Sequence, residues 1–292
     1  MNATIRTAFW LAAKLTRNGM LRLARVFGWL LRFNDVARVT RTNLAACFPD
    51  LSAEELDSLR NDSLMHMSMI FFELGQLSYW SVDELIGDAI FEGEEGLVKH
   101  LHAGQGVILL VPHLGAWEML NVYLGTEHSV AALYDRPRQE GVEAAIKSAR
   151  QRFEGEMYPI GVAGMRSVIK ELRAGRLVAI LPDQVPEKES GVYAPFFGQP
   201  ALTMTLPFQL ADKTGARLLL GVVERVTDGP LKYRFRFSEL APAMSDSLAD
   251  RAAAMNASIE AAVLKCPEQY QWEYKRFKRP PEGGQENIYR RQ

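Results

Sequence analysis

His113 and Glu118 are the two residues of this 292-residue chain whose types and spacing best suit proton-transfer chemistry. A neutral imidazole can remove a hydroxyl proton while the oxygen attacks a thioester carbonyl, and its pKa suits that task near neutral pH. A carboxylate bonded to the other ring nitrogen fixes the tautomer and stabilises the imidazolium that forms. The pair therefore predicts His113 as a general base and Glu118 as its orienting partner.

The elements around this pair are expected to be a strand and a helix. The apolar run 107–111 before Pro112 predicts a buried strand, and a helix is expected to begin near Gly115. His113 then lies at the carboxyl end of a strand, where open α/β sheets bind their ligands. Spacing alone is a weak signal, because a His and a Glu five residues apart can both be surface charges, and the strand-to-helix context strengthens it.

The sequence lacks the motifs that would indicate other kinds of catalysis. It contains no G-x-S-x-G elbow of a serine hydrolase, no H-E-x-x-H zinc motif, no Walker loop and no dinucleotide-binding glycine pattern. The only two cysteines, Cys47 and Cys266, form no disulfide framework and suit a reducing environment. We therefore expect no metal and no cofactor, and a histidine metal site could arise only by tertiary accident from His100, His102 and His128.

The rest of the chain alternates strand-like and helical patterns, which favours an α/β fold. We expect one domain, in which helices flank a mixed sheet. Ser52 and Glu55 form a capping box that predicts a helix ending near Trp80. The alternating pattern of 232–237 predicts an edge or antiparallel strand. The remaining expected strands are 107–111, 130–134, 177–181 and 217–223, and the remaining helices lie near 116–124, 140–153, 164–174 and 246–265.

The N-terminal segment combines apolar and basic residues. Residues 1–42 contain eight basic residues and one acid, although the net charge of the whole chain is −1. Basic residues interrupt every apolar run between Phe9 and Leu31, so no 18-residue apolar span is present. We expect residues 1–42 to form a basic amphipathic arm, in which Phe9–Leu31 is a single helix lying in the interface of an anionic membrane rather than a segment that binds nucleic acid. Residues 43–292 are expected to form the α/β domain. An amphipathic helix packed on the domain and a tilted span are the alternatives.

Several stretches together resemble one family, the lipid A late acyltransferases. These lauroyl and myristoyl transferases belong to the wider glycerolipid and lysophospholipid acyltransferase group with its H-x4-D/E motif. The order and spacing of the stretches cover most of the chain and are more specific than any single motif. The matching stretches are Asn43–Pro49, His113–Glu118, Asp183–Gln184, Pro195–Gly198 with Thr203, and Tyr270–Lys278.

The resemblance implies a substrate pair and roles for further residues. It implies a fatty acyl thioester of acyl carrier protein as donor and a hydroxyl of a glycolipid, a lipid A precursor, as acceptor. The reaction would occur at the cytoplasmic face of the inner membrane, without a metal or redox cofactor. Arg136 lies where the group carries a basic residue that contacts substrate phosphate, and Asp183 and Gln184 would line the acceptor site. Without the resemblance, Arg136 reads as a surface charge and Asp183 as a cap or turn residue.

Two departures from the family pattern leave alternatives open. Ala116 precedes Trp117 where the family often has a polar residue, and the usual Asn-Pro does not follow Arg136. An acyltransferase acting on another lysolipid or an aminolipid would share most of these features. A noncatalytic lipid-binding protein with this fold, and a thioesterase in which water replaces the lipid hydroxyl, are the other hypotheses.

Overall fold

The computed structural model describes residues 3–128, 130–134, 148–153, 155–228, 232–283 and 286–290. Its centre is a seven-stranded sheet in the order β1-β9-β8-β2-β5-β3-β4. The five strands from β8 to β4 run parallel, and β9 joins β8 antiparallel, so the mixed sheet expected from the sequence is confirmed. The strands are β1 (Ile90–Glu92), β2 (Val107–Leu110), β3 (Val130–Tyr134), β4 (Glu156–Pro159), β5 (Leu177–Ile180), β8 (Arg217–Arg225) and β9 (Tyr233–Glu239).

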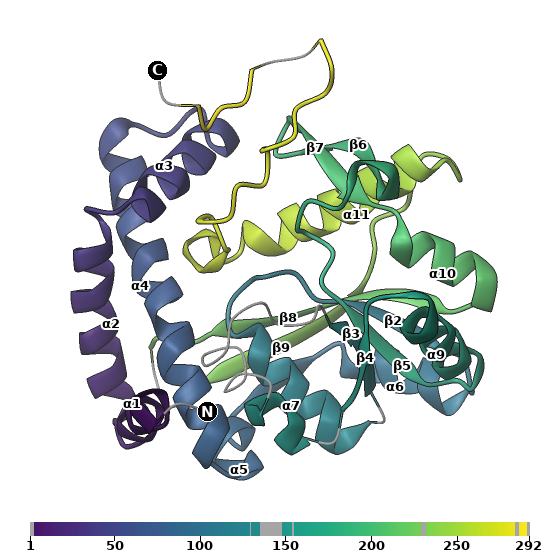
Figure 1. The fold of residues 1–292 in the computed structure, drawn as a ribbon, viewed down its shortest axis with the longest axis horizontal. Coiled ribbons are helices and arrows are strands. Elements are labelled where there is room, and N and C mark those ends of the chain that lie inside the picture. The colour runs from purple at the N-terminus through teal and green to yellow at the C-terminus, as the bar shows by residue number, and fades with distance from the viewer. Residues whose placement is uncertain are drawn as a thin grey trace.

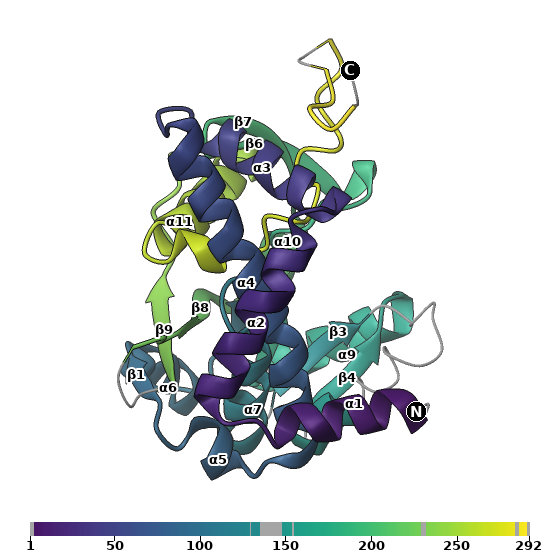
Figure 2. The ribbon, with the colours of Figure 1, turned by 90° about the vertical axis from the view of Figure 1, so that its left-hand side faces the viewer.

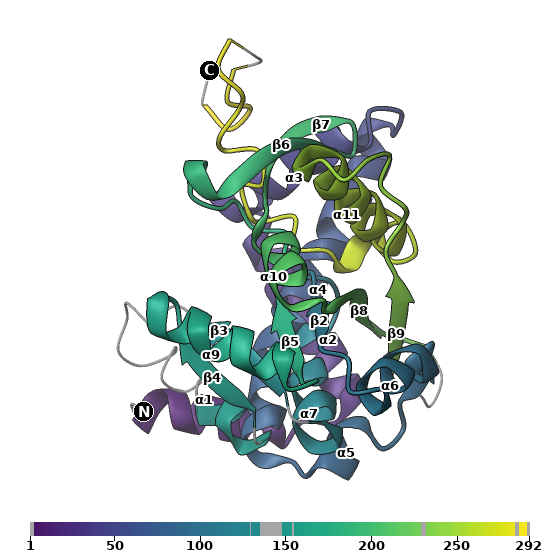
Figure 3. The same ribbon diagram turned by 90° about the vertical axis from the view of Figure 1, so that its right-hand side faces the viewer.

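Strand β2 lies in the middle of this sheet because both of its faces are apolar. All four of its residues are buried, as a strand covered by helices on both sides requires. Val107 and Leu109 pack into one core with helices α5 (Val82–Ile86), α6 (Glu94–His102) and α7 (Trp117–Glu127). Ile108 and Leu110 pack into the other core, which includes α9 (Val162–Arg173), α10 (Leu206–Thr214) and α11 (Leu248–Val263). Figures 1 and 3 show these helices on the two faces of the sheet.

The predicted helices and strands largely correspond to observed ones. The capping box of Ser52 and Glu55 opens helix α4 (Ala53–Tyr79), and α11 matches the predicted Ala-rich helix. Of the helix expected at 140–153, residues 148–150 are helical, Gln151–Phe153 forms the 3-10 turn η1, and residues 140–147 lie outside the described residues. A separate antiparallel hairpin of β6 (Gly191–Phe196) and β7 (Gln199–Met204) packs on α11 and was not predicted.

The N-terminal segment folds as two helices, so the single helix expected from Phe9 to Leu31 is wrong. Helix α1 (Ala3–Ala13) ends before Thr16, whose side chain caps the N-terminus of α2 (Arg17–Leu31). Figure 2 shows α2 lying along α4 while α1 crosses below it, and α3 (Asp35–Cys47) continues the chain. Gly28 allows the close approach, since a Cβ there would lie 2.7 Å from the backbone nitrogen of Met65.

These helices have a buried face and an exposed apolar face. Phe9, Met20 and Ala24 are buried against α4, so α1 and α2 share small apolar clusters with that helix. In the described residues, no helix is both long and apolar enough to cross a membrane. Large apolar side chains nevertheless remain exposed along both helices: Trp10, Leu11, Leu23, Val26, Phe27, Trp29 and Leu30.

Candidate active site

The turn between β2 and α7 carries His113 and requires a glycine at its sharpest point. Gly115 has φ +63°, and a Cβ there would lie 1.9 Å from the carbonyl oxygen of Val223. Its N–H donates to the carbonyl of Gln269 at 2.9 Å, and the N–H of Ala116 donates to Val223 at 2.8 Å. The turn is therefore bonded to strand β8 and to the C-terminal segment, which fixes where the His113 side chain projects.

Asp183 holds the His113 imidazole. Its Oδ1 lies 2.7 Å from Nδ1 of His113, and its Oδ2 accepts the backbone N–H of the same residue at 2.8 Å. The two residues are 70 positions apart but adjacent in space, because they follow the neighbouring parallel strands β2 and β5. Because a carboxylate accepts hydrogen bonds, Nδ1 carries the proton and Nε2 of a neutral imidazole is the free basic atom.

Burial and charge act in opposite directions on this pair. Burial by itself would lower the pKa of His113, but the Asp183 carboxylate, with Glu118 and Glu273 nearby, raises it above its usual range. Burial by itself would raise the pKa of Asp183, but the His113 charge and hydrogen bonds lower it. Asp183 is thus ionised at neutral pH and stabilises an imidazolium, as the acid of a catalytic triad does.

Glu118 does not make the contact with the imidazole that the sequence analysis expected. Its carboxylate is buried at the start of α7 and receives two hydrogen bonds from Arg150, at 2.9 Å from Nε and 2.5 Å from a terminal nitrogen. Glu118 still contributes negative charge near His113. The orienting bond that we assigned to Glu118 is made instead by Asp183, a residue that the resemblance had placed in the acceptor site.

The free nitrogen of His113 faces polar and aromatic side chains. The Gln184 amide nitrogen lies 3.2 Å from Nε2, and the Trp117 indole packs edge-on against the ring at 5.2 Å. The His113 side chain is only 11% exposed, so a substrate must displace a neighbour to reach Nε2. The structure thus brings His113, Asp183 and Gln184 together, while Arg136 lies outside the described residues.

The C-terminal segment forms one wall of the site. Gln271 donates its backbone N–H to the His113 carbonyl at 3.0 Å, and its side-chain oxygen lies 3.4 Å from the Gln184 amide nitrogen. Burial raises the pKa of Glu273 to about 7, against opposing effects from its own N–H, His113 and Gln271. Sequence reasoning included both residues in a matching stretch but gave them no role, because only their place beside His113 reveals one.

Two comparisons with known proteins decide the family. The chain matches the bacterial lipid A biosynthesis acyltransferase family over residues 4–279. It is 27% identical to the lipid A biosynthesis palmitoleoyltransferase of Escherichia coli, over 84% of this chain and 79% of that protein. It is 28% identical to the lauroyltransferase of the same organism, over 94% and 90% of the two chains. This chain belongs to the lipid A biosynthesis acyltransferase family.

Another relative, which aligns over a shorter part of the chain, is named for a different acceptor lipid. The chain is 29% identical to a phosphatidylinositol mannoside acyltransferase of Mycobacterium tuberculosis, over 45% of this chain and 43% of that protein. The aligned part is thus less than half of either chain. Family membership supports acyl transfer onto a lipid A precursor, and it makes the protein an acyltransferase.

Motif residues of this acyltransferase that lie away from His113 hold the C-terminal segment in place. Asn43 on α3 donates to the carbonyls of Trp272 and Tyr274, at 2.6 and 2.9 Å. Arg276 is buried and donates to the carbonyl of Leu202 and to the hydroxyl of Thr203, at 2.6 and 2.9 Å. The matching stretches therefore meet in space to fix the wall that contains Gln271 and Glu273.

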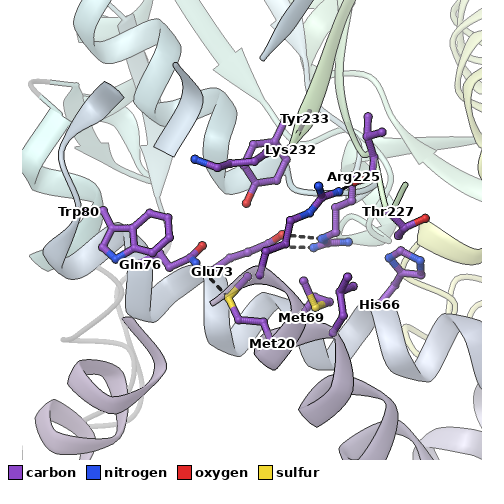
Figure 4. A pocket seen from close by; sticks show the side chains of 13 residues that line it. Met20, His66, Met69, Glu73, Gln76, Trp80, Arg225, Thr227, Lys232 and Tyr233 are labelled. Carbon is purple, nitrogen blue, oxygen red and sulfur yellow. Dashed lines mark hydrogen bonds and ion pairs between the residues drawn. The ribbon is translucent and has the colours of Figure 1, made fainter. Parts of the chain in front are cut away.

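A small cavity lies between α2, α4, the end of β8 and the start of β9 (Figure 4). Its volume is about 40 Å³, and a buried ion pair of Arg225 and Glu73, 2.6 Å apart, forms part of its wall. The Gln269 side chain bonds the backbone N–H and carbonyl of Arg225, and the Gln269 carbonyl accepts the N–H of Gly115, so this wall is connected to the active-site turn.

Among the described residues, no group of three His, Cys, Asp or Glu side chains could hold a metal ion.

Proposed function

We propose that this acyltransferase moves a fatty acyl group from an acyl carrier protein thioester to a hydroxyl of a lipid A precursor, at the cytoplasmic face of the inner membrane. The observation that carries the proposal is the bond between His113 and Asp183, in a member of the lipid A acyltransferase family. This bond occupies Nδ1 of His113 and leaves Nε2, at the carboxyl ends of the parallel strands β2 and β5, as the basic nitrogen that accepts a proton. No metal or cofactor enters the reaction.

The chemistry assigns each group one task. The acceptor hydroxyl takes the place of the Gln184 amide and gives its proton to Nε2 of His113 as its oxygen attacks the thioester carbonyl. Asp183 stabilises the resulting imidazolium. The tetrahedral intermediate expels the carrier thiolate, which takes the proton back from Nε2. Glu118 supports the site through Arg150 and adds negative charge near the imidazole, and Arg136 contacts a phosphate of the acceptor.

The exposed face of α1 and α2 supports a membrane location. Trp29 and Phe33 are 52% and 72% exposed, and the Arg32 guanidinium lies over both rings, at 4.7 and 4.6 Å. Apolar side chains with basic neighbours suit the headgroup region of an anionic bilayer, where the acceptor lipid lies. We propose that residues 1–42 bind inner-membrane lipids through this face and that residues 43–292 carry the reaction.

Point variants test the membrane face better than deletion, because Phe9 and Met20 belong to the core. Trp29→Ser with Phe33→Ser should weaken binding to vesicles that contain anionic phospholipid, by about tenfold or more. Thr4→Ala, an exposed change on α1, is the control. Unchanged vesicle binding of the folded double variant would contradict the membrane role of this face.

The transfer itself is tested with purified protein, acyl carrier protein thioesters of several chain lengths and a lipid A precursor. Wild type should form acylated lipid, and His113→Ala should lose about 10²–10⁴-fold in rate. Acyl release without acceptor would identify a thioesterase, and inactivity with every thioester would favour a noncatalytic lipid-binding protein. A second candidate acceptor, a phosphatidylinositol mannoside or related lysolipid, is worth including because of the mycobacterial relative.

A further inference from the structure

Two exposed aliphatic side chains project from the loop that joins β4 to α9. Ile160 is 65% exposed and Val162 is 71% exposed, more than any of the apolar side chains named along α1 and α2. Gly161 lies between them, and no heavy atom of the described residues lies within 4 Å of the position that a Cβ would take there. Ile160, Gly161 and Val162 therefore form a projecting apolar surface, which we call the β4–α9 tip.

The backbone around the β4–α9 tip is held by the first turn of α9. Gly164 is buried against the end of β4, where a Cβ would lie 2.0 Å from the Pro159 carbonyl oxygen. Met165 donates its backbone N–H to the Gly161 carbonyl at 2.9 Å. The backbone is thus packed and hydrogen-bonded, while the two aliphatic side chains project from it. Substitution of these side chains should change the surface of the protein more than its fold.

The exposed charges that follow the tip are all basic. Arg166, Lys170 and Arg173 are exposed on α9, whereas Glu171, the one acidic residue of that helix, is buried in an ion pair. Arg166 follows Val162 by about one helical turn, which is about 6 Å along the helix axis. Apolar side chains of peripheral proteins enter a bilayer by about 5–10 Å, so a basic residue at that height meets the lipid phosphates. This arrangement of apolar and basic groups matches an anionic bilayer.

The tip lies on the same edge of the sheet as the active site. Strands β2, β5, β3 and β4 are parallel neighbours, so their carboxyl ends share one edge. His113 and Asp183 follow β2 and β5 on that edge, and the tip follows β4. At about 4.8 Å between neighbouring strands, the end of β4 lies roughly 14 Å from the end of β2. A bilayer against the tip would therefore bring lipid headgroups close to His113.

The N-terminal helix α1 extends to the same side of the protein as the tip. Figures 2 and 3 both show the N-terminal end of α1 and the corner formed by β3, β4 and α9 on one side, with α6 on the opposite side. Trp10 and Leu11 of α1 are exposed apolar residues. An extended bilayer surface can contact both places at once, whereas a small acidic protein would be attracted by the basic residues of α9 alone. The two separate apolar surfaces therefore favour a bilayer over a docked protein.

We propose that the β4–α9 tip is a second membrane contact, in which Ile160 and Val162 enter the apolar boundary of an anionic bilayer and Arg166 meets lipid phosphate. Together with α1, the tip turns the carboxyl edge of the sheet toward the bilayer, so that a lipid acceptor reaches His113 without leaving the membrane. This proposal rests on the membrane location proposed above. It does not depend on which acyl transfer the protein catalyses.

A fluorescent probe on the tip tests the contact directly. Val162→Cys carries an environment-sensitive fluorophore, and Ala103→Cys, exposed at the end of α6, carries the same label as the matched control. Cys47 and Cys266 are buried, so the label reacts with the introduced thiol. Vesicles of mixed phosphatidylglycerol and phosphatidylcholine should shift the emission of the Val162 probe to shorter wavelength and protect it from iodide quenching. The Ala103 probe should keep its emission and its quenching.

Substitutions then measure what each group contributes to vesicle binding. Ile160→Ser with Val162→Ser should weaken binding about tenfold or more, whereas Ile160→Leu with Val162→Leu should retain it, because leucine keeps the tip apolar. Arg166→Gln should weaken binding to the anionic vesicles about fivefold and leave binding to phosphatidylcholine alone unchanged. Arg173→Gln, at the far end of α9, should change binding less than about twofold, because it lies more than a Debye length from the bilayer. Thermal melts show whether each variant is folded.

The outcomes separate the tip from the proposed function. An unchanged Val162 probe on vesicles that bind the protein would overturn the second contact and leave the membrane face of α1 and α2 standing. A probe that responds to acyl carrier protein but not to vesicles would overturn it too, and would assign the tip to the carrier. Wild type that binds no vesicles would refute the tip and the membrane location together, while transfer assays with detergent-dispersed acceptor would still decide the reaction. If the double serine variant does not fold, the labelled Val162→Cys protein decides.

Discussion

Asp183 bonds His113 through both carboxylate oxygens, one to the backbone N–H and one to the imidazole Nδ1. The first bond holds the turn, and the second fixes the tautomer. The Asp183 side chain therefore fixes both the position of the base and its protonation. Replacing one carboxylate oxygen by an amide nitrogen, in Asp183→Asn, should separate the structural effect from the effect on catalysis.

Asp183→Asn should retain the fold but lose most of the transfer activity. The amide can accept one of the two hydrogen bonds but lacks the charge that favours imidazolium, so the pKa of His113 should fall. We expect kcat to drop about 10²–10⁴-fold. Kinetics and a thermal melt check this, with the exposed Asp212→Asn as control. Near-wild-type kcat in Asp183→Asn would mean that the carboxylate serves only the turn.

Glu118 and Arg150 should behave as a coupled pair. Glu118 is buried, the Arg150 side chain is 34% exposed, and the two share two hydrogen bonds, so removing either leaves the other charge without this partner. In a double-mutant cycle of Glu118→Gln and Arg150→Met, measured by denaturant unfolding, the coupling should be about 1–3 kcal/mol. The exposed pair of Arg38 and Asp35 should give less than about 0.5 kcal/mol. Equal coupling energies in the two pairs would contradict the view that Glu118 supports the site through Arg150.

The difference between Glu118 and Asp183 shows what sequence could and could not predict. Strand, turn and helix around His113 follow from local patterns, as does the capping box of Ser52, because each depends on neighbours in the chain. The bond to Asp183 depends on β2 and β5 being adjacent, which no local pattern specifies. Spacing alone favoured Glu118, yet Arg150 competes for that carboxylate from a segment 32 residues away.

The break between α1 and α2 was missed for a related reason. Hydrophobic periodicity continues through the segment, and only the Thr16 side chain, which caps α2, marks the end of one helix and the start of another. The hairpin β6–β7 was not predicted either. Its role, to hold Arg276 through Leu202 and Thr203, depends on the distant C-terminal segment.

Gly115→Ala should disrupt the active-site turn. The left-handed φ of +63° is costly for alanine, and the added Cβ would lie 1.9 Å from the Val223 carbonyl oxygen, so the backbone must move. We expect a loss of stability of about 3 kcal/mol or more and little residual transfer. Gly104→Ala is the matched control, since its φ is +69° but nothing lies within 4 Å of its Cβ. That change should cost only about 1–2 kcal/mol. Equal melting temperatures for the two variants would show that the turn tolerates the contact.

The last prediction concerns His66, a buried histidine that lines the cavity between α2 and α4. Burial, and then the charge of Arg225, lowers its pKa to about 3, and within the described part of the chain its Nδ1 has no hydrogen-bond partner. The folded protein therefore keeps His66 neutral, whereas in the unfolded chain it takes up a proton below its ordinary pKa of about 6.5. Between those two pKa values the unfolded state binds more protons, so this contribution to the free energy of unfolding is complete above about pH 6.5 and is lost as the pH falls. From pH 7 to pH 5 the loss in the free energy of unfolding should be about 2 kcal/mol.

His66→Leu should remove that part of the acid sensitivity, and the exposed His102→Leu should not. Denaturant unfolding at pH 7, 6 and 5 compares the three proteins, and an equal decline in His66→Leu and wild type would show that His66 is protonated, or exposed, in the folded state.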